Sequence, residues 1–221
     1  MGRVWTEENT GFQLPEDFFE KNILKEVSPA TLSAFQMDLM FDEQVLDLMR
    51  KQSEGLNSEQ KKKQEQEDRE MIEGIATVKN LVRCMQKLND NLLRPLLPAR
   101  ADALGQEAWQ EVTDRLMRSG NDTFVENSVL LLSRADDSYI DQIEKGLADI
   151  RQPYAKSEAC VLLSYRKRHA ALPAIMDVYE ELSAGGDDKV DDFRQGPLYA
   201  IYRLMNHPVN VEENGSETGG E

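Results

Sequence analysis

Residues 130–133, Leu-Leu-Leu-Ser, decide the fold, because they return 31 residues later as Val-Leu-Leu-Ser at positions 161–164. Similar sequence at a fixed interval predicts a repeated structural unit. The same apolar cluster occurs a third time, after a longer interval, as Leu198, Ala200, Ile201 and Leu204. We therefore expect one type of helix to occur three times in the second half of the chain.

A second set of apolar residues alternates with these runs. In each set the spacing is three residues and then four, which places all its members on one face of a helix. Together the two sets predict three helix–turn–helix units, at about 104–134, 138–168 and 170–206, the last lengthened by an acidic loop near 185–192. The three sets are Trp109, Val112 and Leu116; Ile140, Ile143 and Leu147; and Leu172, Ile175 and Tyr179.

These units are expected to stack. A single pair of helices has apolar residues on more than one face, and neighbouring pairs placed side by side bury them in a continuous core. Period-two alternation of apolar residues, which is typical of strands, is nearly absent. The sequence thus predicts an all-α chain that forms an α-solenoid, with N-terminal helices as its cap. The alternative is an irregular helical bundle whose helices have similar lengths.

Two segments of the second half carry a resemblance to a known family. They are residues 154–163, Tyr-Ala-Lys-Ser-Glu-Ala-Cys-Val-Leu-Leu, and residues 170–175, Ala-Ala-Leu-Pro-Ala-Ile. This part of the chain resembles the HEAT-like repeats, including the short variety of bilin-lyase-type proteins. The resemblance covers about 100 of the 221 residues and implies paired helices. The Leu-Pro opening occurs in one unit only, which departs from the family's pattern.

Residues 1–100 are expected to form a separate N-terminal helical region. A short helix is predicted near Pro15, and a longer one near 58–93 whose apolar seam runs from Ile75 to Leu92. The seam could pack on the repeats or pair with a second copy. Gly74 disfavours an unbroken helix, because glycine costs about 1 kcal/mol relative to alanine in a helix interior. Residues 207–221, which contain almost nothing apolar, are predicted to be a disordered acidic tail.

The charge of the chain is unevenly distributed. The formal net charge is −15, but residues 50–100 carry +3 whereas residues 1–49 and 101–205 carry −7 each. Such an acidic chain is not expected to bind nucleic acid, which requires a basic face. No apolar run is long enough for a membrane span and no signal peptide is visible. We therefore expect a cytoplasmic protein that does not associate with a membrane.

The sequence contains no recognisable catalytic or metal-binding motif. Cys84 and Cys160 are far apart, and neither has a cysteine or histidine at ligand spacing. His169 and His207 also stand alone, and no glycine-rich phosphate loop is present. We therefore predict no catalytic residue, no metal and no cofactor, and favour a protein that is not an enzyme.

The second helices of the units are the expected binding surface, because helical repeats present an extended curved face to other proteins. The basic cluster at 166–168 has two interpretations: it complements the dipole of the helix that it ends, or it anchors an acidic segment of a partner. The candidate partner-binding residues are Asn127, Ser157, Tyr165, Arg166, Lys167, Arg168 and Arg194.

Three functional hypotheses follow. The first is a non-enzymatic protein–protein interaction scaffold or adaptor. The second, suggested by the net charge, is an acidic inhibitor or immunity-type protein that mimics nucleic acid and binds a basic partner. The third, a lyase or DNA-repair enzyme on a HEAT-like scaffold, rests only on the resemblance of the fold. The sequence leaves the oligomeric state open.

Overall fold

The computed structural model describes residues 37, 41–54, 59–184 and 192–206. Within these ranges every regular element is a helix, so the predicted all-α class is confirmed for the described part of the chain. No helix in these ranges is long and apolar enough to cross a membrane. The helix expected near Pro15, the acidic stretch 185–191 and the predicted tail 207–221 lie outside the described residues.

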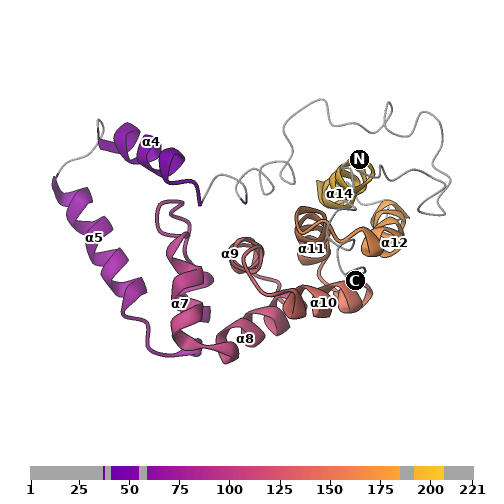
Figure 1. Cartoon of the computed structure of the whole chain (residues 1–221), viewed down its shortest axis with the longest axis horizontal. Helices are drawn as coiled ribbons and strands as arrows, with labels where there is room; N and C mark the ends of the chain where they lie inside the picture. Colours follow the sequence, from indigo (N-terminus) through magenta and orange to yellow (C-terminus); the bar gives the residue numbers. More distant parts are fainter. Residues whose placement is uncertain (1–36, 38–40, 55–58, 185–191, 207–221) are drawn as a thin grey trace, which may run out of the picture.

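In the described ranges four helices precede the predicted pairs: α4 (Glu43–Glu54), α5 (Glu59–Glu73), α6 (Val78–Met85) and α7 (Leu96–Leu104). Three pairs come next: α8 (Gln106–Leu116) with α9 (Asp122–Leu132), α10 (Asp137–Gly146) with α11 (Pro153–Tyr165), and α12 (Leu172–Ala184) with α14 (Gln195–Asn206). Short 3-10 helices, Leu147–Asp149, His169–Ala171 and Asp192–Arg194, precede α11, α12 and α14. From α5 to α11 the helices follow one another across the molecule, and α14 lies beside α11 and α12 (Figure 1).

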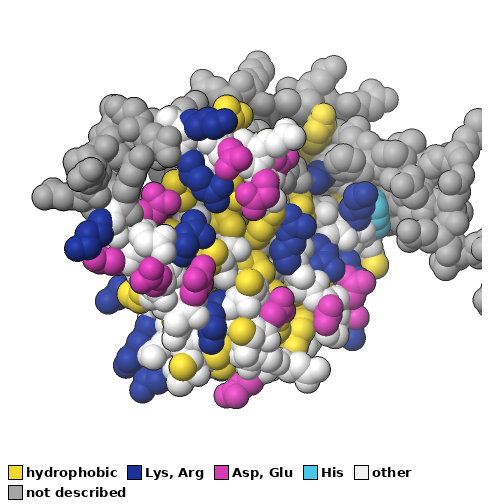
Figure 2. Space-filling view, turned by 60° about the vertical axis from the view of Figure 1, so that its left-hand side comes forward, with side chains coloured by type: hydrophobic (Ala, Val, Ile, Leu, Met, Phe, Trp, Pro, Cys, Tyr) yellow, Lys and Arg dark blue, Asp and Glu magenta, His cyan; other side chains and the backbone are white. Residues whose placement is uncertain are grey.

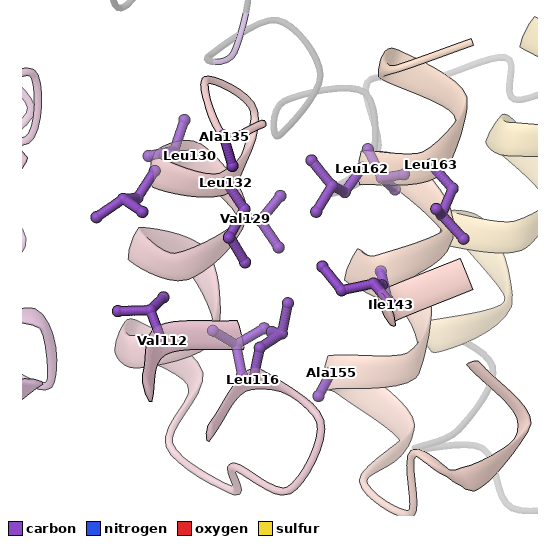
Figure 3. Packing of buried hydrophobic residues seen from close by; sticks show 14 of the residues in the cluster. Val112, Leu116, Val129, Leu130, Leu132, Ala135, Ile143, Ala155, Leu162 and Leu163 are labelled. Atoms are coloured by element: carbon purple, nitrogen blue, oxygen red, sulfur yellow. The ribbon is translucent and has the colours of Figure 1, made fainter. Parts of the chain in front are cut away.

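The second helices of the three pairs are neighbours. Helix α11 packs against α9 on one side and α14 on the other. Of the first-helix residues predicted to face the core, all are buried except Tyr179, which is partly buried. Figure 3 shows Val112 and Leu116 pointing toward Val129 and Leu132, and Ile143 lying near Leu162. The two alternating apolar sets thus predicted the core of these pairs correctly.

Local sequence signals explain where several of these helices begin. The side chain of Asn121 accepts a hydrogen bond from the backbone N–H of Phe124 at 2.7 Å, which caps α9. Pro153 occupies the first turn of α11, where its missing N–H costs nothing. Gly105 separates α7 from α8 with a φ of 81°, a conformation that side-chain-bearing residues rarely adopt.

Helices α11 and α14 approach each other closely at Gly196. A Cβ atom added to Gly196 would lie 2.1 Å from Oγ of Ser157 and 2.5 Å from its carbonyl oxygen. Only glycine fits at this contact, since backbone atoms cannot move aside as the end of a flexible side chain can. The close approach helps to explain why α11 is so thoroughly buried along its length.

The helix expected near 58–93 is divided in two, which corrects that prediction. Helix α5 ends at Glu73, and α6 begins only at Val78 after an extended Thr77 with φ −141°. Gly74 lies at the break, and the Thr77 side chain accepts a hydrogen bond from the N–H of Asn80, so a glycine and a new N-cap end one helix and start another. The apolar seam packs within the chain, because Val82 and Met85 are buried in the main core.

Candidate binding site

Two of the predicted partner-binding residues are buried inside the protein. Asn127 on α9 is 0% exposed, and its side-chain amide donates hydrogen bonds to the carbonyls of Met85 and Leu88 at 2.8 and 2.9 Å. Ser157 is buried at the contact between α11 and α14. Neither side chain is available on the surface, which corrects the expectation. Polar residues on one face of an amphipathic repeat look alike in sequence whether they are solvated or used internally.

Arg166 joins two consecutive helix pairs. Its guanidinium donates to the carbonyl of Ala135 at 2.6 Å and, at 3.4 Å each, to those of Leu132 and Ser133, at the end of α9. It also forms an ion pair with Asp137 in the first turn of α10. Arg166 therefore complements a helix C-terminus, as one of the two interpretations held, but the helix is α9 of the preceding pair rather than its own.

The other basic candidates occupy different environments. Arg168 forms ion pairs with Asp141 and Glu144 of α10, so it ties the two helices of its own pair together. The Glu144 and Asp141 carboxylates raise its pKa. Lys167 is exposed and has a φ of 55°, and Arg194 ends the 3-10 helix before α14, where it is partly buried. The structure does not gather these three cations into one pocket.

Tyr165 and Arg134 contact two residues from the N-terminal side of the chain, Met37 and Phe41. The two residues hold equivalent repeat positions, each directly after its Leu-Leu-Ser run. The Tyr165 hydroxyl donates to the carbonyl of Met37 at 3.3 Å, and the Arg134 guanidinium lies 4.3 Å from the ring centre of Phe41. Met37 is 0% exposed. This part of the second-helix surface is thus already covered by the protein's own chain.

An open groove lies between α5 and α6. It has a volume of about 670 Å³ and is lined by the second half of α5, the Gly74 break, α6 and the segment that follows α6. Ile72, Ile75 and Leu93 are its buried residues, and Met71 at its edge is 59% exposed. Figure 2, which brings the α5 side of the molecule forward, shows hydrophobic side chains exposed between acidic and basic ones. An apolar hollow of this size is typical of a ligand-binding site.

Buried polar contacts fix the wall of the groove formed by residues 86–93. Asn127 holds the carbonyls of Met85 and Leu88, as described above. Arg94 is 5% exposed, donates to the same Leu88 carbonyl at 3.4 Å and forms an ion pair with Glu126 of α9 at 2.9 Å. Asn127 was predicted to contact a partner on the second-helix surface. It instead holds the wall of the α5–α6 groove in place. Without these bonds the carbonyls at the end of α6 would be buried unpaired.

Three cations lie at intervals of four residues, two of them on α6 and the third just after its end. They are Lys79, Arg83 and Lys87, which we call the basic ridge, and all are exposed. Arg83 and Lys87 line the groove directly. Lys87 lies in the turn that directly follows α6, where its N–H donates to the carbonyl of Cys84 at 3.0 Å. Within the described residues none of the three side chains has an ion-pair or hydrogen-bond partner. The sequence contained this signal, but only spacing within a correctly bounded helix reveals it.

The cysteine that lines the groove is not an activated nucleophile. This residue is Cys84, and burial raises the pKa of its thiol, so little thiolate is present at neutral pH. Burial likewise raises the pKa of Cys160, which lies in the core of α11. Among the described residues no group of three or more His, Cys, Asp or Glu side chains is placed to hold a metal ion.

A second, smaller hollow of about 240 Å³ lies at the start of α8 and α10. Trp109 and Tyr139 stack beside it with ring centres 6.2 Å apart, and the Trp109 indole N–H donates to Asp102 at 3.1 Å. These contacts satisfy the aromatic pair internally, so the α5–α6 groove is the better candidate for binding. Comparison with known proteins finds no matching family profile, curated protein or solved structure.

Proposed function

We propose that this chain is a non-enzymatic protein-interaction scaffold built from HEAT-like helix pairs, and that it binds its partner in the α5–α6 groove. Support for a solenoid-like scaffold comes from the three pairs that follow in order, with α11 between α9 and α14. Arg166 links one pair to the next through main-chain carbonyls. In a stack of this kind each helix pair is held by its neighbours. The stack therefore gives the groove a rigid support, which favours a preformed binding surface.

The observation that carries the proposal is the apolar groove. Its residues include Met71, which is exposed at the edge of a hollow that also contains the buried side chains of Ile72, Ile75 and Leu93. Large apolar side chains that stay open to solvent around a hollow often mark an interaction site. The second-helix surface at Arg134 and Tyr165 is a weaker candidate, because Met37 and Phe41 already cover it.

Site-specific photo-crosslinking tests this function with a matched pair of positions. Met71 in the groove and Leu48 on α4 are large apolar residues of nearly equal exposure, 59% and 58%. A photoreactive phenylalanine placed at each position in the source cell should trap a discrete foreign protein from position 71 only. The purified partner should then bind Met71→Glu more weakly than Leu48→Glu.

The same experiment can contradict the proposal. Equal trapping from both positions would mean that exposed apolar residues cross-link without specificity. A product that contains only this chain, or a trapped small molecule, would also exclude a partner protein in the groove. Urea unfolding of both glutamate variants controls for loss of structure, because each change lies at an exposed position and should alter stability by less than about 0.5 kcal/mol.

A further inference from the structure

We infer that the occupant of the groove is an amphipathic helix of a partner protein, with acidic side chains along one edge that pair with the basic ridge. This inference rests on the proposed function and specifies the chemistry of the partner. It is carried by two features: an apolar floor between two helices, and a rim that contains Arg83 and Lys87, with Lys79 one turn earlier on α6. None of these three cations has a partner among the residues that the structure describes.

The shape of the groove favours a helix. Its floor consists of side chains from α5, α6 and the segment after α6, which is how an amphipathic helix is received between two others. Such a helix inserts apolar residues at positions i, i+3, i+4 and i+7. A small apolar molecule would fit the floor, but it would leave the basic ridge without a role.

The basic ridge favours an acidic edge on that helix. Lys79 and Lys87 are eight residues apart, so the ridge extends for about 12 Å along α6 and the turn that follows it, and its Arg83 and Lys87 border the groove. Acidic residues spaced by four on a partner helix would face its three cations in turn. Arg166 and Arg168, in contrast, are engaged by carboxylates or carbonyls, and what distinguishes the ridge from other exposed cations is the apolar groove beside it. The ridge lies in residues 50–100, which carry a net charge of +3 in a chain of net charge −15.

The acidic edge is needed on one side of the helix only. Asp68 on α5 and Asp90 after α6 also line the groove. The Asp68 carboxylate accepts from the Gln64 side chain at 3.0 Å, and that of Asp90 accepts from the N–H of Leu92 at 2.8 Å. Asp68 disfavours a row of carboxylates on the α5 side, whereas Asp90 follows Lys87 by three residues and lies past the end of the ridge. The fitting partner is therefore acidic toward α6 and neutral or basic toward α5.

Fluorescence anisotropy with three designed helical peptides tests the inference on the full chain. The peptides share one apolar face and one neutral edge, and carry glutamate, glutamine or lysine at three positions spaced by four on the other edge. The glutamate peptide should bind about tenfold more tightly than the lysine peptide at low salt, since three weak exposed ion pairs replace three like-charge contacts. The preference should shrink as salt is added.

Charge reversal supplies the decisive variants. Lys79→Glu, Arg83→Glu and Lys87→Glu combined should reverse the preference, so that the lysine peptide binds more tightly. The matched control reverses three exposed cations outside the groove, Arg118→Glu, Lys145→Glu and Arg151→Glu, and changes the net charge equally. The control should keep the glutamate preference. A loss of preference in both variants would mean that only the overall charge matters and would overturn the inference.

Other results separate this inference from the proposed function. Equal affinity for the three peptides would overturn the acidic edge but leave a protein-binding groove. Absence of binding would overturn the helix, and the cross-linking at Met71 would still decide the function. Maleimide labelling of Cys84 at pH 8.5 identifies the occupant, because the glutamate peptide should slow it. If labelling slows as the protein concentration rises without peptide, the occupant of the groove is a second copy of the chain. If the peptide leaves Cys84 labelling unchanged, the occupant is another segment of this chain. Either result overturns the inference.

Discussion

The three C-terminal helix pairs and the α5–α6 region differ in what covers their apolar side chains. Helix α11 has neighbours on both sides, and its apolar residues Ala159, Leu162 and Leu163 are fully buried. Helix α5 packs against α7, and Met71 near its C-terminal end remains 59% exposed. The same kind of amphipathic helix therefore builds a closed core in one region and an open groove in the other.

The polar side chains differ in the same way. In the helix pairs, Arg166, Arg168 and Lys156 each bond to an acid or a carbonyl of a neighbouring element. Along α6, the basic ridge has no partner among the described residues. Satisfied cations thus lie at the contacts that hold the fold together, whereas the unsatisfied ones lie next to the apolar hollow that we propose as a binding surface.

The largest predicted effect contrasts truncation in the two regions. Leu162→Ala removes a fully buried side chain and should lower the free energy of unfolding by about 2–5 kcal/mol, since it leaves a cavity. Met71→Ala should change stability by less than about 0.5 kcal/mol. Urea denaturation followed by circular dichroism measures both. A large loss for Met71→Ala would show that the groove is part of the core.

A smaller effect is expected at the contact between α11 and α14. Gly196→Ala should cost about 2–3 kcal/mol, because its Cβ would overlap Ser157 backbone atoms and force the helices apart. Gly120→Ala is the matched control: its Cβ would meet only the flexible Gln152 side chain at 3.6 Å. The two variants are compared by urea unfolding. Equal stabilities would mean that the close helix approach is absent in solution.

Asn127 links the two regions and gives an intermediate prediction. Asn127→Ala leaves the Met85 and Leu88 carbonyls without these donors and should cost about 2 kcal/mol. It should also weaken binding of the glutamate peptide, because the groove wall is no longer held. Ser128→Ala, whose hydroxyl bonds only within its own helix, should preserve that affinity. If Asn127→Ala binds like the wild type, Asn127 does not position the groove.

The smallest effect is a pH dependence of the closed region. Burial raises the pKa of Cys160, so the folded protein keeps the thiol proton while the unfolded chain releases it above about pH 8.5. The stability that Cys160 contributes is therefore present below pH 8.5 and is lost as the pH rises. Relative to Cys160→Ala, the wild type should lose about 1 kcal/mol between pH 8.5 and 9.5. A constant difference across this range would contradict a buried thiol.

The Leu-Leu-Ser runs together with the alternating second set of apolar residues predicted three helix pairs and their core residues. The spacing of apolar residues indicates which side of a helix faces the core. Ile143 and Leu162 were therefore correctly predicted to be core residues. The break at Gly74 was only suggested, because a single glycine weakens a helix without ending it; the Thr77 N-cap and the Arg100 bond to the Glu73 carbonyl complete the break.

The candidate site was predicted less well than the fold. Asn127 and Ser157 were assigned to a surface, but hydrogen bonds to residues 42 and 39 positions away and a close helix contact bury them. Such long-range partners leave no mark in local spacing. The basic ridge was visible in the sequence, but the apolar groove beside it is lined by α5, α6 and the segment after α6 together, which local spacing does not reveal.

Hydrogen–deuterium exchange of the full chain with the glutamate peptide tests most directly whether the open region is the binding region. Bound peptide should slow exchange in residues 71–93, which enclose the groove, and leave α9 and α11 unchanged. The ridge-reversed variant should lose this protection. Protection that appears instead around Arg134 and Tyr165, where Met37 and Phe41 lie, would place binding on the second helices and contradict the account.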